Sequence, residues 1–175
     1  FIEQDAPLGL GHAVLCAQKA IGNNPFAVIL PDDLVDAPQS CIGELCEARS
    51  RCGGGNVIAV EDVPKEETSK YGIASLDKNE PELVVGLVEK PKPENAPSTL
   101  AVIGRYVFEP DIFEELKKVK PGVGGEIQLT DAMASSLSST PMRVCRFKGR
   151  RFDCGSKQGF IAATVHFARK AGFTI

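Results

Sequence analysis

The sequence predicts an α/β fold in which a mixed, mostly parallel sheet is flanked by helices. Three observations support this fold class. Residues 26–30 form an unbroken apolar run that ends at Pro31 and two aspartates. Helix-like and strand-like patterns alternate along the chain. With 43% hydrophobic and 25% charged residues, the 175 residues can bury one core, so we expect a single domain over residues 1–175.

The first part of the chain is predicted to form a helix followed by a strand. Residues 11–20 favour a helix that a glycine-rich turn opens and that ends near Gly22. Residues 26–30 (FAVIL) suit a strand that is buried on both faces of a parallel sheet. Asp32 and Asp33 follow this strand directly. They are therefore expected at the carboxyl edge of the sheet, where open α/β folds bind ligands.

The middle of the chain is predicted to be mostly extended and the last third to alternate. Runs rich in β-branched and aromatic residues, separated by turn residues, indicate strands at residues 57–63, 71–76, 83–89 and 100–108. Residues 112–118 form a firm helix prediction, because acids lie in the first turn and lysines in the last. The remaining elements expected are helices at residues 126–137 and 157–170 and a strand at residues 142–147.

Composition argues against several classes of partner. The formal net charge is −3 and the basic residues are scattered, so no nucleic-acid partner is expected. No apolar run approaches the roughly 18 to 20 residues that cross a bilayer, so we expect no membrane and a cytoplasmic location. The six cysteines have irregular spacings without a CxxC pair and are expected to be reduced thiols.

Two aspartates are candidates for a metal site. Asp32 follows a predicted strand, and Asp153 lies in the stretch FDCG near the C-terminus. If they converge, they suit Mg²⁺, which takes one or two carboxylates and completes its shell with water and substrate phosphates. The alternative is that one caps a loop and the other a helix. Their spacing in the sequence does not decide between these interpretations.

Two further segments leave a functional and a structural interpretation open. Residues 8–13 (LGLGHA) place two glycines at a helix start, where a ligand can approach the backbone closely or the chain simply turns. Glu89 and Lys90 end a strand before a proline, either on opposite faces or splayed by the proline. Such a lysine can bind phosphate and such a carboxylate can accept from sugar hydroxyls, whereas a solvated strand end is the alternative.

Six stretches in order resemble the bacterial UDP-glucose pyrophosphorylases, members of the nucleotidyltransferase family that makes nucleotide sugars. The resemblance extends over nearly the whole chain. The stretches that carry it are residues 7–17 (PLGLGHAVLCA), 27–32 (AVILPD), 88–92 (VEKPK), 104–107 (GRYV), 125–132 (GEIQLTDA) and 153–155 (DCG).

The resemblance implies a Rossmann-like nucleotide-diphospho-sugar transferase fold and a set of site residues. Asp32, Lys90 and Asp153 would be catalytic, with Asp32 and Asp153 holding Mg²⁺ and Lys90 contacting the sugar phosphate. Glu89 and the backbone near Gly72 would grip the glucose hydroxyls, while Glu126 and Gln128 would shape the pocket wall. The residues implied to contact the uracil are Gln4, Gly9, Leu10 and Gly11.

The implied reaction is transfer of a uridylyl group from UTP to glucose-1-phosphate, which gives UDP-glucose and pyrophosphate. The phosphate oxygen of the sugar attacks the α-phosphorus in line, so no nucleophilic Ser, Cys or His is required. The family also suggests a homo-oligomer. The alternatives are a thymidylyl- or guanylyltransferase that acts on another sugar phosphate, or a non-catalytic module that binds sugar nucleotides.

The sequence departs from the family pattern at its start. Members begin with a strand and a glycine-rich loop of the type GxGTR, followed by a lysine, which bind the triphosphate, and this sequence contains no such stretch. The fold is therefore expected to be incomplete at the N-terminus, and the chain stops somewhat short at the C-terminal end. Missing strands would leave exposed edges and apolar surface. We predict that the 175-residue chain alone is inactive and poorly stable.

Overall fold

A computed structural model describes residues 1–175 except for the side chain of Val123. The strands are β1 Phe26–Ile29, β2 Asp33–Asp36, β3 Asn56–Asp62, β4 Gly72–Leu76, β5 Val84–Glu89, β6 Leu100–Phe108, β7 Met142–Cys145 and β8 Arg150–Asp153. The α-helices are α1 Leu10–Cys16, α2 Gln18–Ile21, α3 Cys41–Arg51, α4 Ile112–Lys118, α5 Leu129–Ser136 and α6 Lys157–Lys170. Short 3₁₀ segments span Lys65–Lys70, Pro93–Asn95 and Val123–Gly125.

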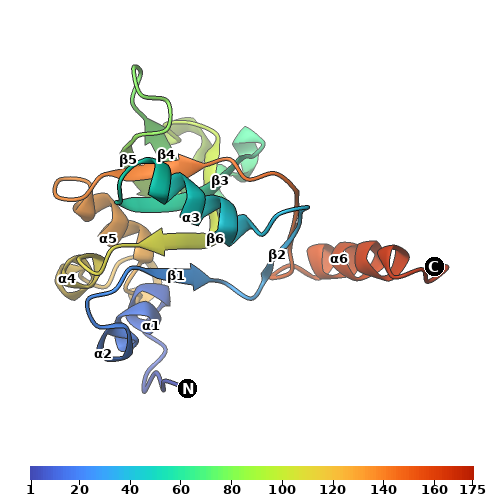
Figure 1. The fold of residues 1–175 in the computed structure, drawn as a ribbon, viewed down its shortest axis with the longest axis horizontal. Coiled ribbons are helices and arrows are strands. Elements are labelled where there is room, and N and C mark those ends of the chain that lie inside the picture. The colour runs from blue at the N-terminus through green and yellow to red at the C-terminus, as the bar shows by residue number, and fades with distance from the viewer.

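A six-stranded sheet forms the centre of the molecule (Figure 1). Its strand order is β5-β4-β6-β3-β7, with β1 paired to β6. Four strands run in one direction, as expected for a mostly parallel sheet: β1, β3, β4 and β7. The other two strands, β5 and β6, run in the opposite direction. Because β6 lies between the others, β3–β7 is the only parallel pairing among the described strands. The mixed α/β sheet is confirmed, and most of its pairings are antiparallel.

The two faces of the sheet are covered by different helices. Along β3, Ile58 and Val60 belong to a cluster with residues of α1, α4 and α5. Val57 and Ala59 belong to a second cluster, which Leu45 of α3 helps to form. Successive side chains of a strand point to opposite faces, so this strand is buried on both. That double burial explains why it looks like a continuous apolar run in the sequence.

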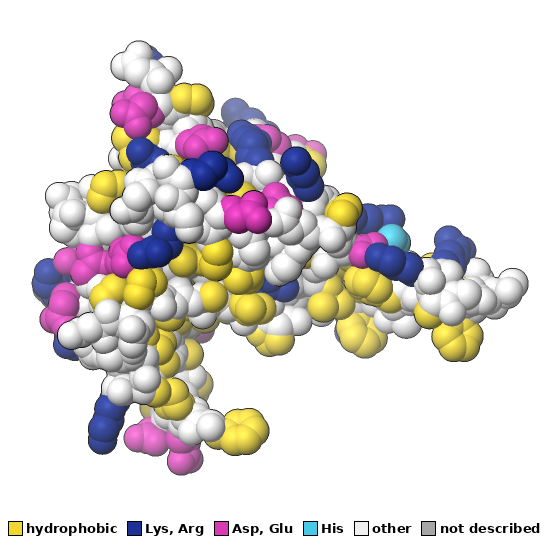
Figure 2. Space-filling model, viewed as in Figure 1, with side chains coloured by type: hydrophobic (Ala, Val, Ile, Leu, Met, Phe, Trp, Pro, Cys, Tyr) yellow, Lys and Arg dark blue, Asp and Glu magenta, His cyan; other side chains and the backbone are white. Residues whose placement is uncertain are grey.

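Helix α6 extends away from the sheet, beyond the small sheet of β2 and β8 (Figure 1). Its contact with this sheet is aromatic and ionic. The ring of Phe152 lies 4.9 Å from that of His166, and His166 Nε2 lies 2.7 Å from Asp36 Oδ2. Yellow apolar side chains gather along the lower edge of Figure 2, and α6 contributes the exposed Phe160 and Ile161. None of the described helices is long and apolar enough to cross a membrane.

The structure corrects three expectations about elements. The strand predicted at residues 26–30 is not buried on both faces, because Ala27 and Ile29 are exposed. β1 is also paired to β6 alone among the described strands, so it is not flanked by strands on both sides. The helix expected from Glu126 begins only at Leu129, since Gly124 and Gly125 have positive φ and Gln128 is extended. The expected strand at residues 142–147 ends at Cys145. Among the strands and α-helices, β2, α3 and β8 were not predicted.

Candidate active site

A cavity of about 330 Å³ lies over one face of β6, next to the small sheet, and its lining includes Val102, Gly104 and Tyr106. Six of the predicted site residues line it, namely Leu10, Asp32, Gly72, Glu89, Lys90 and Asp153. Glu126 and Gln128, expected in the pocket wall, line it as well. Gln4, Gly9 and Gly11 are not among its lining residues. Another cavity of about 300 Å³ between α3 and β7 holds none of the predicted residues.

Asp32 and Asp153 are brought together by the small sheet. The antiparallel register of β2 and β8 places Asp33 opposite Asp153, and the backbone N–H of Cys154 donates to the Asp32 carbonyl at 2.7 Å. Asp153 Oδ1 and Asp32 Oδ2 lie 3.1 and 3.3 Å from the point that a Cβ of residue 155 would occupy. Both carboxylates therefore face one small space, which Gly155 leaves open.

This pair fits the ligand chemistry of magnesium. Among the described residues no group of three or more His, Cys, Asp or Glu could enclose a metal. Two carboxylates facing one space are nevertheless sufficient for Mg²⁺, which keeps several waters and takes oxygens from substrate phosphates. The helix-cap alternative does not apply to Asp153, because Ser156 caps α6 by accepting from the N–H of Gly159 at 3.0 Å. Asp153 does cap its loop, since its Oδ1 accepts from the N–H of Gly155 at 3.1 Å, and its Oδ2 makes no hydrogen bond of this kind with the residues that the structure describes.

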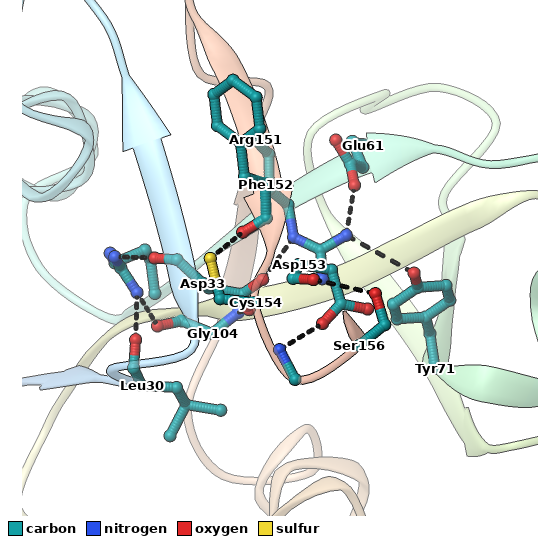
Figure 3. A network of polar contacts seen from close by, with 12 residues as sticks. Leu30, Asp33, Glu61, Tyr71, Gly104, Arg151, Phe152, Asp153, Cys154 and Ser156 are labelled. Atoms are coloured by element: carbon teal, nitrogen blue, oxygen red, sulfur yellow. Dashed lines mark hydrogen bonds and ion pairs between the residues drawn. The ribbon is translucent and has the colours of Figure 1, made fainter. Parts of the chain in front are cut away.

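Asp33 has a structural role instead. Its carboxylate is buried, accepts from the backbone N–H of Gly104 at 2.6 Å and pairs with Arg151 (Figure 3). A side chain at position 104 would collide with this carboxylate, because its Cβ would lie 2.6 Å from Asp33 Oδ2. The hydrogen bond thus ties β2 to β6 and fixes the turn that carries Asp32.

Glu89 and Lys90 meet at the end of β5, where both line the cavity. Lys90 is the one non-glycine residue of the described chain with positive φ, 43°. This bend brings Lys90 Nζ to 3.5 Å from Glu89 Oε1, so the two side chains neither splay nor point to opposite faces. Backbone strain of this kind persists where the surrounding structure holds it, and it is frequent at functional sites. Here the Lys90 N–H donates to the Tyr71 carbonyl at 2.9 Å.

The glycine turn near the helix start packs against another segment of the protein. A Cβ at Gly9 would lie 2.7 Å from Glu126 Cβ, and one at Gly11 would lie 2.7 Å from the Ile127 carbonyl oxygen. Gly11 N–H donates to that oxygen at 2.9 Å. Gln4 Nε2 donates to the Gly9 carbonyl at 3.2 Å. The glycines therefore have a structural reason of their own, and their predicted contact with a base stays a prediction.

Three further residues that line the cavity, Tyr71, Tyr106 and Arg151, were not predicted as site residues. Burial raises the pKa of the Tyr106 phenol, so this side chain stays a neutral hydroxyl at physiological pH. Arg151 could have been found from its spacing. It precedes Asp153 by two residues, which places both side chains on one face of a strand, but the strand itself was not predicted.

The fold is a mixed α/β sheet with helices on both faces, its cavity is lined by carboxylates and lysines, and sequence comparison defines the family of this α/β protein. The family model described as Nucleotidyl transferase matches residues 1–170. The chain belongs to the nucleotidyl transferase family. It is 52% identical, over 85% of its length, to the UTP–glucose-1-phosphate uridylyltransferase of Komagataeibacter xylinus. The match covers 53% of that relative, so the chain spans about half of its length.

Solved structures agree with this relationship. A UDP-glucose pyrophosphorylase complexed with UDP-glucose is 42% identical to the chain, with a TM-score of 0.89. This match covers 95% of the chain and 65% of that structure. A UTP-bound enzyme of the same name from Acinetobacter baumannii is 38% identical, with a TM-score of 0.81, over 94% of the chain and 58% of that structure.

Proposed function

We propose that the protein transfers a uridylyl group from UTP to glucose-1-phosphate and forms UDP-glucose and pyrophosphate. The observation that carries the proposal is the convergence of Asp32, Asp153 and Lys90 on one cavity. The chain is also similar to enzymes named for this reaction. Such a transfer needs a divalent cation, an anionic phosphate oxygen on the sugar and a cationic side chain that orients it.

The residues of the cavity have distinct roles in this proposal. Asp32 and Asp153 would hold Mg²⁺, which when bound supplies positive charge to the phosphate oxygens. Lys90 is a compact point charge suited to the phosphate of the sugar. Glu89, largely buried beside Gly72, accepts hydrogen bonds from the glucose hydroxyls. The attacking phosphate oxygen is already anionic, so the chain only has to orient it.

The test is an assay of pyrophosphate release in the natural protein that contains this chain. We expect turnover with UTP, glucose-1-phosphate and Mg²⁺, and a rate at least tenfold lower with dTTP. Asp32→Asn and Asp153→Asn should each reduce kcat/KM by about 10² or more, since each removes one carboxylate of the cation pair. Equal rates with dTTP would favour a thymidylyltransferase instead, and full activity of both variants would overturn the site.

The same assay tests the chain by itself. We propose that residues 1–175 alone do not turn over, because the sequence contains no GxGTR stretch for the triphosphate. The exposed Ala27 and Ile29 of β1 agree with low stability of the isolated chain. Turnover by the purified 175-residue chain would contradict this part of the proposal.

A further inference from the structure

Arg151 is a buried cation between the two halves of the cavity. Its side chain is 8% exposed, and it forms ion pairs with Asp33 and with Glu61, the latter at 2.6 Å. Its guanidinium lies 5.2 Å from the centre of the Tyr71 ring, with Nη1 at 3.5 Å from the hydroxyl (Figure 3). A buried charge is tolerated only where it is paired. The partners of Arg151 lie in β2, in β3 and directly before β4.

The β2–β8 ladder explains why a cation is needed at this position. Asp33 and Asp153 are direct cross-strand partners, and two like charges in that relation destabilise a sheet. Arg151 lies opposite Val35 in the same ladder and reaches diagonally to Asp33. By neutralising Asp33, it removes the repulsion and leaves Asp153 available to a cation.

The same side chain is connected to the lysine end of the cavity. Tyr71 stacks against the guanidinium through its ring. The carbonyl of Tyr71 accepts the N–H of Lys90, whose φ of 43° needs such support. A shift of Tyr71 would therefore release the backbone that holds Lys90 beside Glu89.

We propose that Arg151 is a positioning residue that sets the geometry of both ends of the site. It engages Asp33 and Glu61, so that Asp32 and Asp153 are the carboxylates left for the cation, and it fixes Tyr71, which holds Lys90. The inference rests on the proposed function, since it assigns Arg151 a part in the same reaction. Arg151 touches no reacting atom in this scheme.

The geometry requires arginine rather than any cation. The planar guanidinium donates to Asp33 through Nε and to Glu61 through Nη1, while its Cζ lies over the Tyr71 ring, 5.2 Å from the ring centre. A lysine ammonium is a single point charge on a flexible stem and cannot make these contacts together. Arg151→Lys is therefore the informative variant, because it keeps the buried charge and removes the fixed fork.

The experiment measures Mn²⁺ binding by electron paramagnetic resonance, together with KM for glucose-1-phosphate, in the natural protein that contains this chain. Mn²⁺ prefers the same oxygen ligands as Mg²⁺. We expect Arg151→Lys to raise the Kd for Mn²⁺ about tenfold, as loss of a supporting contact does at metal sites, and to raise KM severalfold. Arg146→Lys is the matched control, since Arg146 pairs with Asp62 at an exposed position, and both values should stay unchanged.

A second variant covers the case in which Arg151→Lys does not fold. The double variant Asp33→Asn with Arg151→Met removes both charges of the pair, and the amide oxygen that Asp33→Asn introduces can still accept from the Gly104 N–H. Thermal unfolding identifies which variant is folded. In the double variant no charge on Asp33 remains to be neutralised, so Mn²⁺ binding should stay near that of the unaltered protein while KM for glucose-1-phosphate rises, because nothing fixes Tyr71.

The outcomes separate this inference from the proposed function. A folded variant with the Mn²⁺ affinity and KM of the unaltered protein would overturn the role of Arg151, while UDP-glucose formation by the unaltered protein would leave the function intact. Weakened Mn²⁺ binding with an unchanged KM would overturn the link to Lys90. If the unaltered protein neither binds Mn²⁺ nor forms UDP-glucose, the proposed function itself fails.

Discussion

At Gly72, a single hydrogen atom in place of a methyl group lets β4 approach α5 closely beside the cavity. A Cβ at this position would lie 2.9 Å from Thr130 Oγ1 and 3.3 Å from Glu89 Oε2. Thr130 is buried and cannot easily move. The glycine thus determines both a packing contact and the position of a proposed sugar-binding carboxylate.

We therefore expect Gly72→Ala to lower the free energy of unfolding by about 1–3 kcal/mol, as overpacking of a tight core position does. Displacement of Glu89 should also raise KM for glucose-1-phosphate. Urea unfolding and steady-state kinetics measure the two effects. Gly86→Ala in the paired strand is the control, because its Cβ would lie 3.6 Å from Ser75 and should change stability by at most about 0.5 kcal/mol. Equal stability of the two variants would refute the packing argument.

At the scale of the element, α6 depends on a small polar cluster for its attachment to β2. Asp36 Oδ1 pairs with Lys170 and Asp36 Oδ2 with His166. Both hydrogen bonds lower the pKa of Asp36 below its usual value of 3.8. The bond from Lys170 has the larger effect, and the bond from His166 has the next largest. The stabilisation from Asp36 is therefore complete above about pH 4 and is lost as the pH falls through the lowered folded-state pKa.

Because the stabilisation from Asp36 is lost on acidification, we predict that acid releases α6 before the sheet unfolds. Amide hydrogen exchange, corrected for intrinsic rates, should show faster exchange in α6 as the pH falls below about 4 while β6 stays protected. Asp36→Asn should show fast exchange in α6 already at about pH 6, where the carboxylate of the unaltered protein is charged. Asp77→Asn is the control, because the pKa of Asp77 is lowered by the backbone N–H groups of Asn79 and Glu80 instead. Unchanged protection of α6 in Asp36→Asn would show that the aromatic contacts suffice.

The bounds of the elements also show how much of the fold could be predicted from the sequence. The bounds of β6 and α6 agree with those expected, because their patterns are long and unambiguous. β2 and β8 were missed, since DLVD and RRFD are short and charged and become strands only by pairing with each other. Asp32 and Asp153 were therefore assigned by resemblance, as spacing alone could not reveal the ladder that joins them. Arg151 was missed for the same reason.

At the scale of the whole molecule, the cysteines of α3 and β7 report on whether α3 stays against the sheet. Cys41 lies on the buried face of α3, whereas Cys46 and Cys52 are exposed. Burial raises the pKa of the Cys41 thiol to about 12 and that of Cys145 to about 11. Because the thiolate is the reactive form, the raised pKa suppresses the reactivity of both thiols, and burial also denies access to Cys41, whereas Cys145 is partly exposed.

We expect iodoacetamide at about pH 8, near the ordinary pKa of a free thiol, to label Cys46 and Cys52 in the native protein and to label Cys41 only when the sheet opens. Peptide mass spectrometry after timed labelling in increasing urea measures both classes. The rate at Cys41 should rise with the global unfolding transition, because the same face of α3 is buried against β3 and β6. Labelling of Cys41 at the rate of Cys46 without denaturant would mean that α3 leaves the sheet by local opening. The two sheet faces would then unfold independently rather than as one cooperative unit.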